Sequence, residues 1–296
     1  LFESDLRTSA LATVINRQGK IKGAAIEVKS IIEDFHMQAM GGLVAAWELW
    51  EKALIPSLLS GAGTWIGNIE EAISQCNKIQ NFYWRTILKV PDSCPKLGLL
   101  CEPNMTDAKW RIWEAKCLLV LQIKGLEDGS LAKLVYQEAE SRGWPGLGKE
   151  ARQICQEIGI PDINIHNVRK SDIQKALKIS HHTHMMSLFE GSNKLKYIKH
   201  DSFLNIQPYF DDKDLESARM KFKIRTQMLE RIPGNYKNKY KYQENGLKCN
   251  LCLEEMTQAH CKICPERISI RKDLDLENLD DLVIYFKHIL TDKSLK

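Results

Sequence analysis

The stretch NIEEAISQCNKIQNFYWRTILKV, residues 68–90, decides the fold class of this chain. Its apolar side chains recur at the three- and four-residue spacing of one helix face; they are Ile69, Ile73, Cys76, Ile79, Tyr83 and Ile87. Asn68 and Glu71 stand where a helix places its N-cap residue and the capping-box partner. The stretch therefore predicts a long amphipathic helix with one face in a protein core.

Patterns of the same kind extend in both directions. A helix is expected from Lys20 to Met40, closed by two glycines, and the next is expected to break near Pro56. Further helices are predicted at 106–125, 130–143, 148–159, 171–191, 214–232 and 276–290. Only residues 10–20, ALATVINRQGK, suggest a short β-strand. The predicted fold class is all-α: a multi-helix bundle and helical linker, followed by a small C-terminal knuckle rich in cysteine.

Composition limits the classes of function. The formal net charge is +4 over 296 residues, so any cationic surface for nucleic acid must be local. No apolar run reaches the roughly 18–20 residues of a membrane span, so no membrane partner is expected. Four of the nine cysteines cluster near the C-terminus, and the other five are scattered: Cys76, Cys94, Cys101, Cys117 and Cys155. This usage indicates a reducing, intracellular compartment.

The strongest chemical signal is CNLCLEEMTQAHCKIC, residues 249–264. Thiolates and imidazole are the ligands that tetrahedral zinc prefers, and four of them leave no position for a reactive water. We therefore predict a structural zinc site, with the ligands Cys249, Cys252, His260 and Cys264. Cys261 stays open as an alternative to Cys264 for the fourth position.

A basic segment precedes this cluster. Cations neutralise phosphates and aromatic rings stack on unpaired bases, so their mixture is typical of nucleic-acid binding. The candidate cations are Arg219, Lys221, Lys223, Arg225, Arg231, Lys237, Lys239 and Lys241, interleaved with Tyr236, Tyr240 and Tyr242. The alternative is a solvated helix face without a ligand.

Two other motifs are better explained by structural roles than by metal binding or catalysis. His181, His182 and His184 point in different directions on a helix, which favours an exposed polar helix over a second metal site. YFDD at 209–212 looks like the metal-binding aspartates of polymerases but leads into a helix, so Asp212 or Asp214 is expected to be an N-cap. No P-loop, nucleophile elbow or dinucleotide-binding turn occurs. This segment is therefore predicted to lack a catalytic centre of its own.

The order of several stretches resembles the region downstream of the polymerase motifs in non-LTR retrotransposon reverse transcriptases. Those stretches are NRQGKIKGAAIEV, LWEKALIPSLLSGAGTWIG, NIEEAISQCNKIQNFYWRTILKVPDSCP, LLCEPNMTDAKWRIWEAKCLLVLQI, ARMKFKIRTQML and the terminal cysteine–histidine cluster. They cover nearly the whole chain. The cluster departs from the family in having three residues between His260 and Cys264, where four is commoner.

The resemblance implies a thumb-like bundle from about Gly23 to Leu59, a helical linker and a knuckle that engages element RNA or target DNA. The palm with its magnesium-binding aspartates, and the endonuclease, would lie elsewhere in a longer RNA-directed DNA polymerase. The chain begins at Leu1 without a Met, which agrees with a fragment. The expected division is 1–20, a residual palm-to-thumb connection; 21–160, the thumb-like bundle and linker; 161–240, a second helical region with the basic flank; and 241–296, the knuckle and a terminal helix.

The resulting functional prediction is a non-catalytic nucleic-acid-binding part of a reverse transcriptase, active in nucleus and cytoplasm. The bundle would place Lys20, Lys22 and Lys29 on template-primer phosphates, while the knuckle and its flank bind RNA or DNA. The alternative is a stand-alone, zinc-stapled helical scaffold for protein interactions that binds no nucleic acid.

Overall fold

The structure is a computed structural model that describes residues 2–34, 41–67, 69–160, 168–192, 195, 198, 205–229, 248–249 and 251–291. Within these ranges the regular elements are all helical, and strand pairing is limited to one isolated bridge between Lys248 and Glu255. The all-α prediction is confirmed. None of the helices in this part of the chain combines the length and the apolarity that crossing a bilayer requires.

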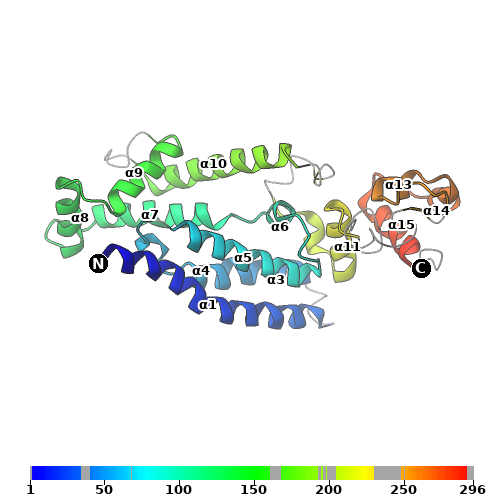
Figure 1. Ribbon diagram of the computed structural model, residues 1–296, viewed down its shortest axis with the longest axis horizontal. Helices are drawn as coiled ribbons and strands as arrows, with labels where there is room; N and C mark the ends of the chain where they lie inside the picture. The colour runs from blue at the N-terminus through cyan, green and yellow to red at the C-terminus, as the bar shows by residue number, and fades with distance from the viewer. Residues whose placement is uncertain are drawn as a thin grey trace.

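The N-terminal part is a bundle built around two long helices. α1 (Phe2–Glu33) packs along α5 (Glu70–Leu88), and the chain between them returns through α3 (Gly42–Leu49) and α4 (Ile55–Leu58), which also contact α1 (Figure 1). A short 3₁₀ turn, η2 (Ala62–Thr64), packs against the following layer. This arrangement buries the apolar stripes of all four helices against one another.

The strand expected at residues 10–20 is wrong, because α1 runs through it without a break. Its buried residues keep helical spacing across the whole length: Ala10, Val14, Ile21, Ala25, Val28 and Ile32. Burial of that face outweighs the weak β-propensity of the local sequence. α1 ends at Glu33, and the remainder of the helix expected to reach Met40 lies outside the described residues.

The break expected at Pro56 is replaced by a π-helical turn, η1 (Trp50–Leu54), between α3 and α4. The N–H of Ile55 donates to the carbonyl of Trp50, one residue further back than in an α-helix. Proline has no N–H to donate to the preceding turn, and the wider π-helical turn accommodates this missing hydrogen bond. The helix therefore continues past the proline, and Trp50 lies fully buried.

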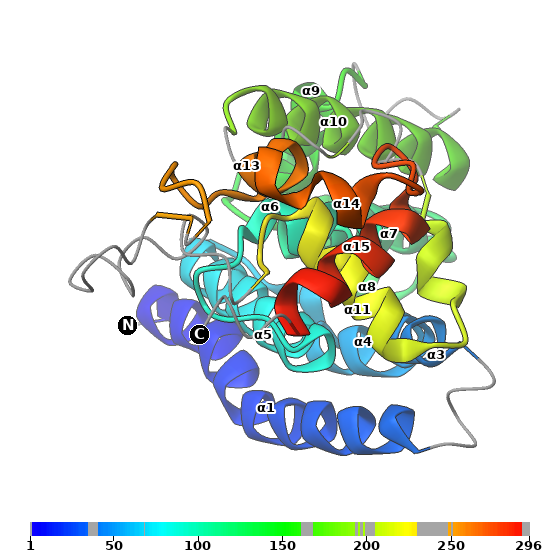
Figure 2. The same ribbon diagram turned by 90° about the vertical axis from the view of Figure 1, so that its right-hand side faces the viewer.

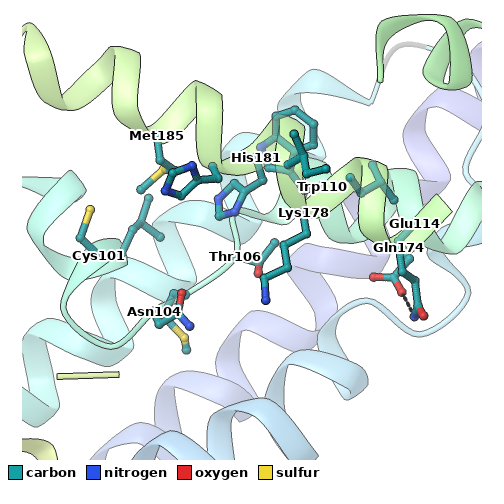
Figure 3. Close-up of a pocket in the computed structure, with 14 residues that line it drawn as sticks. Cys101, Asn104, Thr106, Trp110, Glu114, Gln174, Lys178, His181 and Met185 are labelled. Carbon is teal, nitrogen blue, oxygen red and sulfur yellow. Dashed lines mark hydrogen bonds between the residues drawn. The ribbon is translucent and has the colours of Figure 1, made fainter. Parts of the chain in front are cut away.

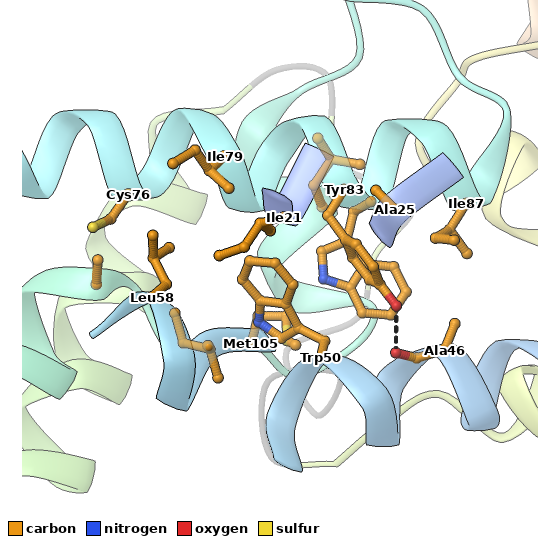
Figure 4. Close-up of a cluster of buried hydrophobic side chains, with 14 of the residues drawn as sticks. Ile21, Ala25, Ala46, Trp50, Leu58, Cys76, Ile79, Tyr83, Ile87 and Met105 are labelled. Atoms are coloured by element: carbon orange, nitrogen blue, oxygen red, sulfur yellow. Dashed lines mark hydrogen bonds between the residues drawn. The ribbon is translucent and has the colours of Figure 1, made fainter. Parts of the chain in front are cut away.

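The apolar stripe of α5 forms the centre of the core, as predicted. All six of its residues are buried, and Figure 4 shows Cys76 beside Leu58 of α4 and Tyr83 beside Trp50. The Tyr83 ring lies 4.8 Å from that of Trp50, and its hydroxyl donates to the carbonyl of Ala46 at 2.6 Å. The N-cap of α5 is Ile69, without a side-chain cap; the expected cap Asn68 lies outside the described residues.

A second layer covers the bundle. α6 (Lys96–Cys101) leads to α7 (Ala108–Lys124), which is capped by the Asp107 carboxylate. α8 (Leu131–Ser141), α9 (Leu147–Glu157) and α10 (Lys170–Glu190) follow, with α9 and α10 packed on α7. Ile158 and Ile160 share one apolar cluster with Ile173 and Leu177, so packing continues across the boundary expected near residue 160. The division into domains stays a prediction.

The helix α11 (Leu215–Arg225) links the C-terminal part to the bundle. Phe222 of α11 belongs to the bundle core, whereas Ile224 belongs to a separate C-terminal cluster. That cluster is built with α13 (Gln258–Ile263), η6 (Pro265–Arg267), α14 (Ile268–Arg271) and α15 (Leu279–Thr291), which gather at one end of the molecule (Figures 1 and 2). Among the described helices, α11 contributes buried residues to both cores, and Leu279 of α15 packs against both.

The YFDD stretch is structural, as its helical context indicates. It forms a 3₁₀ turn, η4 (Pro208–Asp211), and Asp214 then caps α11 by accepting from the N–H groups of Glu216 and Ser217, each at 3.1 Å. Tyr209 is buried and donates to Glu102 at 2.6 Å. These contacts confirm that an aspartate of this region is an N-cap.

Candidate metal centre

Four side chains converge at the base of the C-terminal cluster. Ligand atoms of Cys249, Cys252, His260 and Cys264 all lie within 4.8 Å of one another. Cys249 Sγ is 4.0 Å and Cys252 Sγ 3.7 Å from Cys264 Sγ, and His260 Nε2 is 3.1 Å from Cys252 Sγ. These are the four residues that the spacing predicts.

The local backbone places the first two ligands in one tight turn. The N–H of Cys249 donates to the carbonyl of Glu254 at 2.6 Å, and the N–H of Leu253 donates back to Cys249 at 2.9 Å. Leu253 adopts a left-handed conformation with φ of 65°, which reverses the chain after Cys252. The two-residue gap between the cysteines therefore brings both sulfurs to one side of the turn.

The other two ligands are placed by a short helix. Thr257 is the N-cap of α13, and its hydroxyl accepts from the N–H of His260 at 2.9 Å. Cys264 is the C-cap, and Pro265 directly after it prevents continuation of the helix. One turn of helix thus separates His260 from Cys264, and both project to the same side as the cysteine turn.

Cys261 is excluded as the fourth ligand. Its buried thiol donates to Met256 Sδ at 3.8 Å, and its carbonyl accepts from the hydroxyl of Tyr285. Burial raises the pKa of the Cys261 thiol to about 12, so it stays protonated as a core residue. The alternative that the sequence leaves open is therefore resolved in favour of Cys264.

The pKa values of two of these cysteines are shifted by their surroundings, in opposite directions. Burial of Cys249 opposes ionisation, but N–H groups of Cys252 and Leu251 and the His260 ring donate to its sulfur and lower its pKa to about 6. Burial and the neighbouring thiols of Cys252 and Cys249 raise the pKa of Cys264 to about 11. Binding of a cation by these sulfurs would be coupled to loss of the protons that they carry.

The dimensions agree with a tetrahedral metal. Metal–sulfur bonds of about 2.3 Å give edges of about 3.8 Å between sulfurs in a tetrahedron. The observed sulfur separations of 4.0 and 3.7 Å bracket that value. Since the protein supplies all four ligands, the group suits a closed structural site.

No protein-family model, curated protein or solved structure matches this chain. The assignment of the centre therefore rests on its ligand set and geometry.

The centre is anchored to the rest of the molecule through α11 and α15. Cys249 and Cys264 pack in the same cluster as Phe286 of α15 and Ile224 of α11. Gln258 Nε2 donates to the carbonyl of Ile224 at 2.7 Å, which satisfies a terminal carbonyl of α11. Loss of the centre would therefore disturb α15 and the end of α11.

Arg219, predicted to contact nucleic acid, is buried inside the fold. Its side chain is 1% exposed. Nε donates to the carbonyl of Ile87 at 2.8 Å, Nη2 to Glu33 at 2.8 Å and Nη1 to Glu216 at 2.7 Å. These three acceptors occupy the guanidinium fork, so Arg219 joins α1, α5 and α11 instead of presenting a charge to a ligand.

Lys221 and Arg225 are likewise used within the fold. Lys221 Nζ pairs with Asp212 at 2.7 Å and with Asp280 at the start of α15. Arg225 Nε donates at 2.7 Å to Glu102, whose side chain is fully buried. Burial alone would lower the pKa of Lys221, but the two aspartates raise it above its usual value. The interpretation of Arg219, Lys221 and Arg225 as a nucleic-acid surface is corrected to a structural role.

The remaining predicted contacts have different positions. Lys20 is exposed on α1, Lys29 is half-buried there, and Lys22 Nζ lies 5.4 Å from the centre of the Phe82 ring. Lys223 is half-buried on α11. Outside the described residues lie Arg231, Lys237, Tyr240 and Lys241. The lysines of α1 and Lys223 of α11 thus lie on different helices.

Sequence reasoning missed two residues that position the ligands, Thr257 and Gln258. Thr257 stands three residues before His260, which is the spacing of an N-cap and the N–H it accepts from, so a capping search would have found it. Gln258 gives no such local signal, because its partner is the carbonyl of Ile224 far earlier in the chain.

Proposed function

We propose that this chain is a non-catalytic, nucleic-acid-binding part of a reverse-transcriptase-type polypeptide, with a structural zinc at Cys249, Cys252, His260 and Cys264. The observation that carries the proposal is the convergence of these four ligand atoms within 4.8 Å. A closed set of three thiolates and one imidazole is the donor set of small zinc knuckles. Polymerisation itself is assigned to the magnesium-binding palm that the resemblance places elsewhere.

Zinc would act by ordering the tail. α13, η6 and α14 are short, and the tail's apolar cluster is small, so cross-linking by a metal would add stability of the order of 10 kcal/mol to this part. Because the centre packs on α11 and α15, the metal would fix Cys249, the residue that follows the basic segment, relative to the bundle.

The proposed contacts to RNA or DNA lie in the segment that enters the centre. Residues 231–248 carry five cations against one acid, and tyrosines alternate with the lysines; the cations are Arg231, Lys237, Lys239, Lys241 and Lys248. Such a mixture binds phosphates through its charges and unpaired bases through its rings. Lys20, Lys22 and Lys29 on α1 would form a second, separate contact to a template-primer duplex. The same proposal places the protein in the nucleus and the cytoplasm.

A second candidate function is a zinc-stapled helical scaffold for protein interactions. It is favoured by the internal use of Arg219, Lys221 and Arg225, which removes three cations from the basic surface. The two candidates differ in whether the tail binds polynucleotide.

Salt-dependent binding to an RNA hairpin separates them. Nucleic-acid binding predicts that log affinity falls linearly with log salt, whereas the scaffold predicts no complex. Replacing Lys237, Lys239 and Lys241 with alanine should weaken binding at least tenfold and reduce the salt slope by about 2, since each lost phosphate contact contributes about 0.7–0.9.

The matched control replaces Lys149, Lys170 and Lys175, three exposed lysines far from the centre in sequence, and removes the same charge. An equal loss of affinity in both triple variants would contradict a specific contact by the basic segment. Removal of the metal by a chelator should abolish the difference between the two.

A further inference from the structure

The helix α8 turns its apolar side away from the protein. None of its 11 residues is buried. Leu131, Leu134 and Val135 share one face at the spacing of a helix, and their exposed fractions are 77%, 49% and 59%. A helix at the surface of a protein ordinarily turns such a stripe to the core. The stripe of α8 faces solvent instead.

Polar side chains hold the opposite face of α8 against the protein. Glu140 pairs with Arg152 of α9, and Tyr136 packs against the apolar cluster that α7, α9 and α10 share. Gly148 of α9 approaches so closely that a Cβ added there would lie 3.1 Å from the Tyr136 ring. These contacts fix the rotation of α8 about its axis, so the apolar stripe stays outside.

The stripe extends past the end of the helix to Trp144, whose side chain is 53% exposed. Arg142 lies on the same face as Leu131 and Val135, and its guanidinium carbon is 5.1 Å from the centre of the Trp144 ring. We call Leu131, Leu134, Val135 and Trp144 the α8 patch. α8 lies at the end of the molecule opposite the C-terminal cluster, where another molecule can reach it (Figure 1). Contiguous exposed apolar surface of this kind marks an interaction site.

A single exposed apolar side chain needs no partner, as Ile179 of α10 illustrates. Ile179 is 57% exposed and lines a pocket of about 480 Å³ between α10 and the loop that joins α6 to α7 (Figure 3). Its neighbours on the helix face include the polar residues Lys175, His182 and Thr183. α8 contributes no residue to the lining of that pocket. Ile179 therefore provides a control of matching exposure outside the α8 patch.

Charges of opposite sign bound the α8 patch along the chain. Glu127 precedes α8, Arg142 follows it, and both are exposed. The two are equally far in sequence from the centre of the stripe, which lies between Leu134 and Val135. Two copies of α8 can pack antiparallel about a two-fold axis through this centre. Each Leu134 then meets Val135 of the other copy. Each Glu127 comes near Arg142 of the other copy, so the patch is complementary to itself.

We propose that the α8 patch is the contact of a homodimer, in which two copies of this chain pack α8 against α8 in antiparallel orientation. The charge around the patch favours this occupant over a phosphate-rich one. Residues 126–146 carry four acids against two cations, whereas binding to nucleic acid or to an anionic bilayer needs an excess of cations. α8 is only about 16 Å long, so the contact is small and the dimer dissociates on dilution.

Sedimentation equilibrium of the purified full chain over a hundredfold range of concentration tests the proposal. The weight-average mass is expected to rise from that of one chain toward that of two. Leu134→Asp places a charge at the centre of the stripe and should weaken the dimer at least about tenfold, whereas Ile179→Asp should change it less than about twofold. Both positions are exposed, so both variants should keep the fold.

Charge reversal tests the antiparallel orientation. Glu127→Arg and Arg142→Glu should each weaken the dimer about fivefold, because each substitution places like charges opposite one another twice. An equimolar mixture of the two variants should associate about as strongly as the wild type. In that mixture, each of the two contacts between the different chains again pairs an acid with a base.

A chain that stays monomeric at every concentration would overturn the proposal, and so would equal effects of Leu134→Asp and Ile179→Asp. A mixture of the charge variants that associates no better than each variant alone would overturn the antiparallel contact. The dimer does not use the basic segment, so the triple variant of Lys237, Lys239 and Lys241 should dimerise like the wild type. The proposed nucleic-acid binding and the proposed dimer therefore fail separately.

Discussion

The guanidinium of Arg219 donates to the carboxylate of Glu33 at 2.8 Å and joins α11 to the end of α1, 186 positions earlier in the chain. The same guanidinium bonds the carbonyl of Ile87 near the end of α5. Three helices therefore meet at one buried cation. Because α11 also contributes to the C-terminal cluster, this contact helps to position the candidate metal centre relative to the bundle.

Arg219→Ala should lower the free energy of unfolding by about 1–3 kcal/mol, because it removes the buried donor of the Ile87 carbonyl and leaves Glu33 with Lys89 alone. Urea unfolding followed by circular dichroism measures the change. Lys20→Ala, which removes an exposed cation of α1, should stay within about 0.5 kcal/mol. Equal, small effects of both substitutions would contradict the structural role of Arg219.

Acid should weaken the same junction. Burial of Glu33 works in the opposite direction, but hydrogen bonds from Arg219 and Lys89 hold the pKa of its carboxyl below the usual 4.5. A carboxyl with a lowered folded-state pKa contributes stability that is complete above its unfolded pKa and is lost as pH falls through the folded value. The stability of the wild type should therefore drop below about pH 4.5.

The Glu33→Gln variant isolates this contribution. It should be less stable than the wild type at pH 7, and the difference should shrink as pH falls below 4.5, because the wild-type carboxyl becomes neutral there. Urea midpoints from pH 7 to pH 3 measure it. A difference that is constant over this range would show that charge at Glu33 does not stabilise the fold.

Two glycines in helices should respond oppositely to alanine. A Cβ at Gly63 would lie 2.9 Å from the carbonyl oxygen of Ala115, so Gly63→Ala should cost about 1–3 kcal/mol by separating η2 from α7. A Cβ added at Gly19, within α1, would have no neighbouring atom within 4 Å. Gly19→Ala should therefore raise the free energy of unfolding by up to about 1 kcal/mol. Thermal unfolding of both variants tests the close approach of η2 to α7.

Substitution of a ligand cysteine and of a non-ligand cysteine should affect metal binding differently. Cys264→Ser is expected to abolish binding of a metal and to unfold α13 to α15, because the centre packs in their cluster. Cys261→Ala should keep the metal and cost about 1–2 kcal/mol for the lost thiol volume in the core. Metal analysis with hydrogen exchange of residues 258–291 measures both effects. Retention of metal by Cys264→Ser would return the fourth position to Cys261.

Local patterns predicted what depends on local geometry. The stripe from Ile69 to Ile87 predicted a buried helix face, and the spacing of Cys249, Cys252 and His260 predicted a ligand group, because helix and turn geometry fix both. The choice between Cys261 and Cys264 needed the structure, since it depends on how α13 faces Tyr285 of α15.

Long-range partners explain the failures. The sequence shows that Arg219 and Lys221 are cations, but their acceptors Glu33 and Asp280 lie on other helices, so a buried network looks like a basic surface. The strand expected at residues 10–20 fails for the same reason, because the face of α1 that carries Val14 is buried against other helices. Burial by distant elements outweighs local propensity in these cases.

X-ray absorption at the zinc edge of the purified full chain tests the central claim most directly. The account predicts one zinc per chain, bound by three sulfurs at about 2.3 Å and one nitrogen at about 2.0–2.1 Å. A chain that binds no zinc, or a zinc surrounded mainly by oxygen, would contradict it.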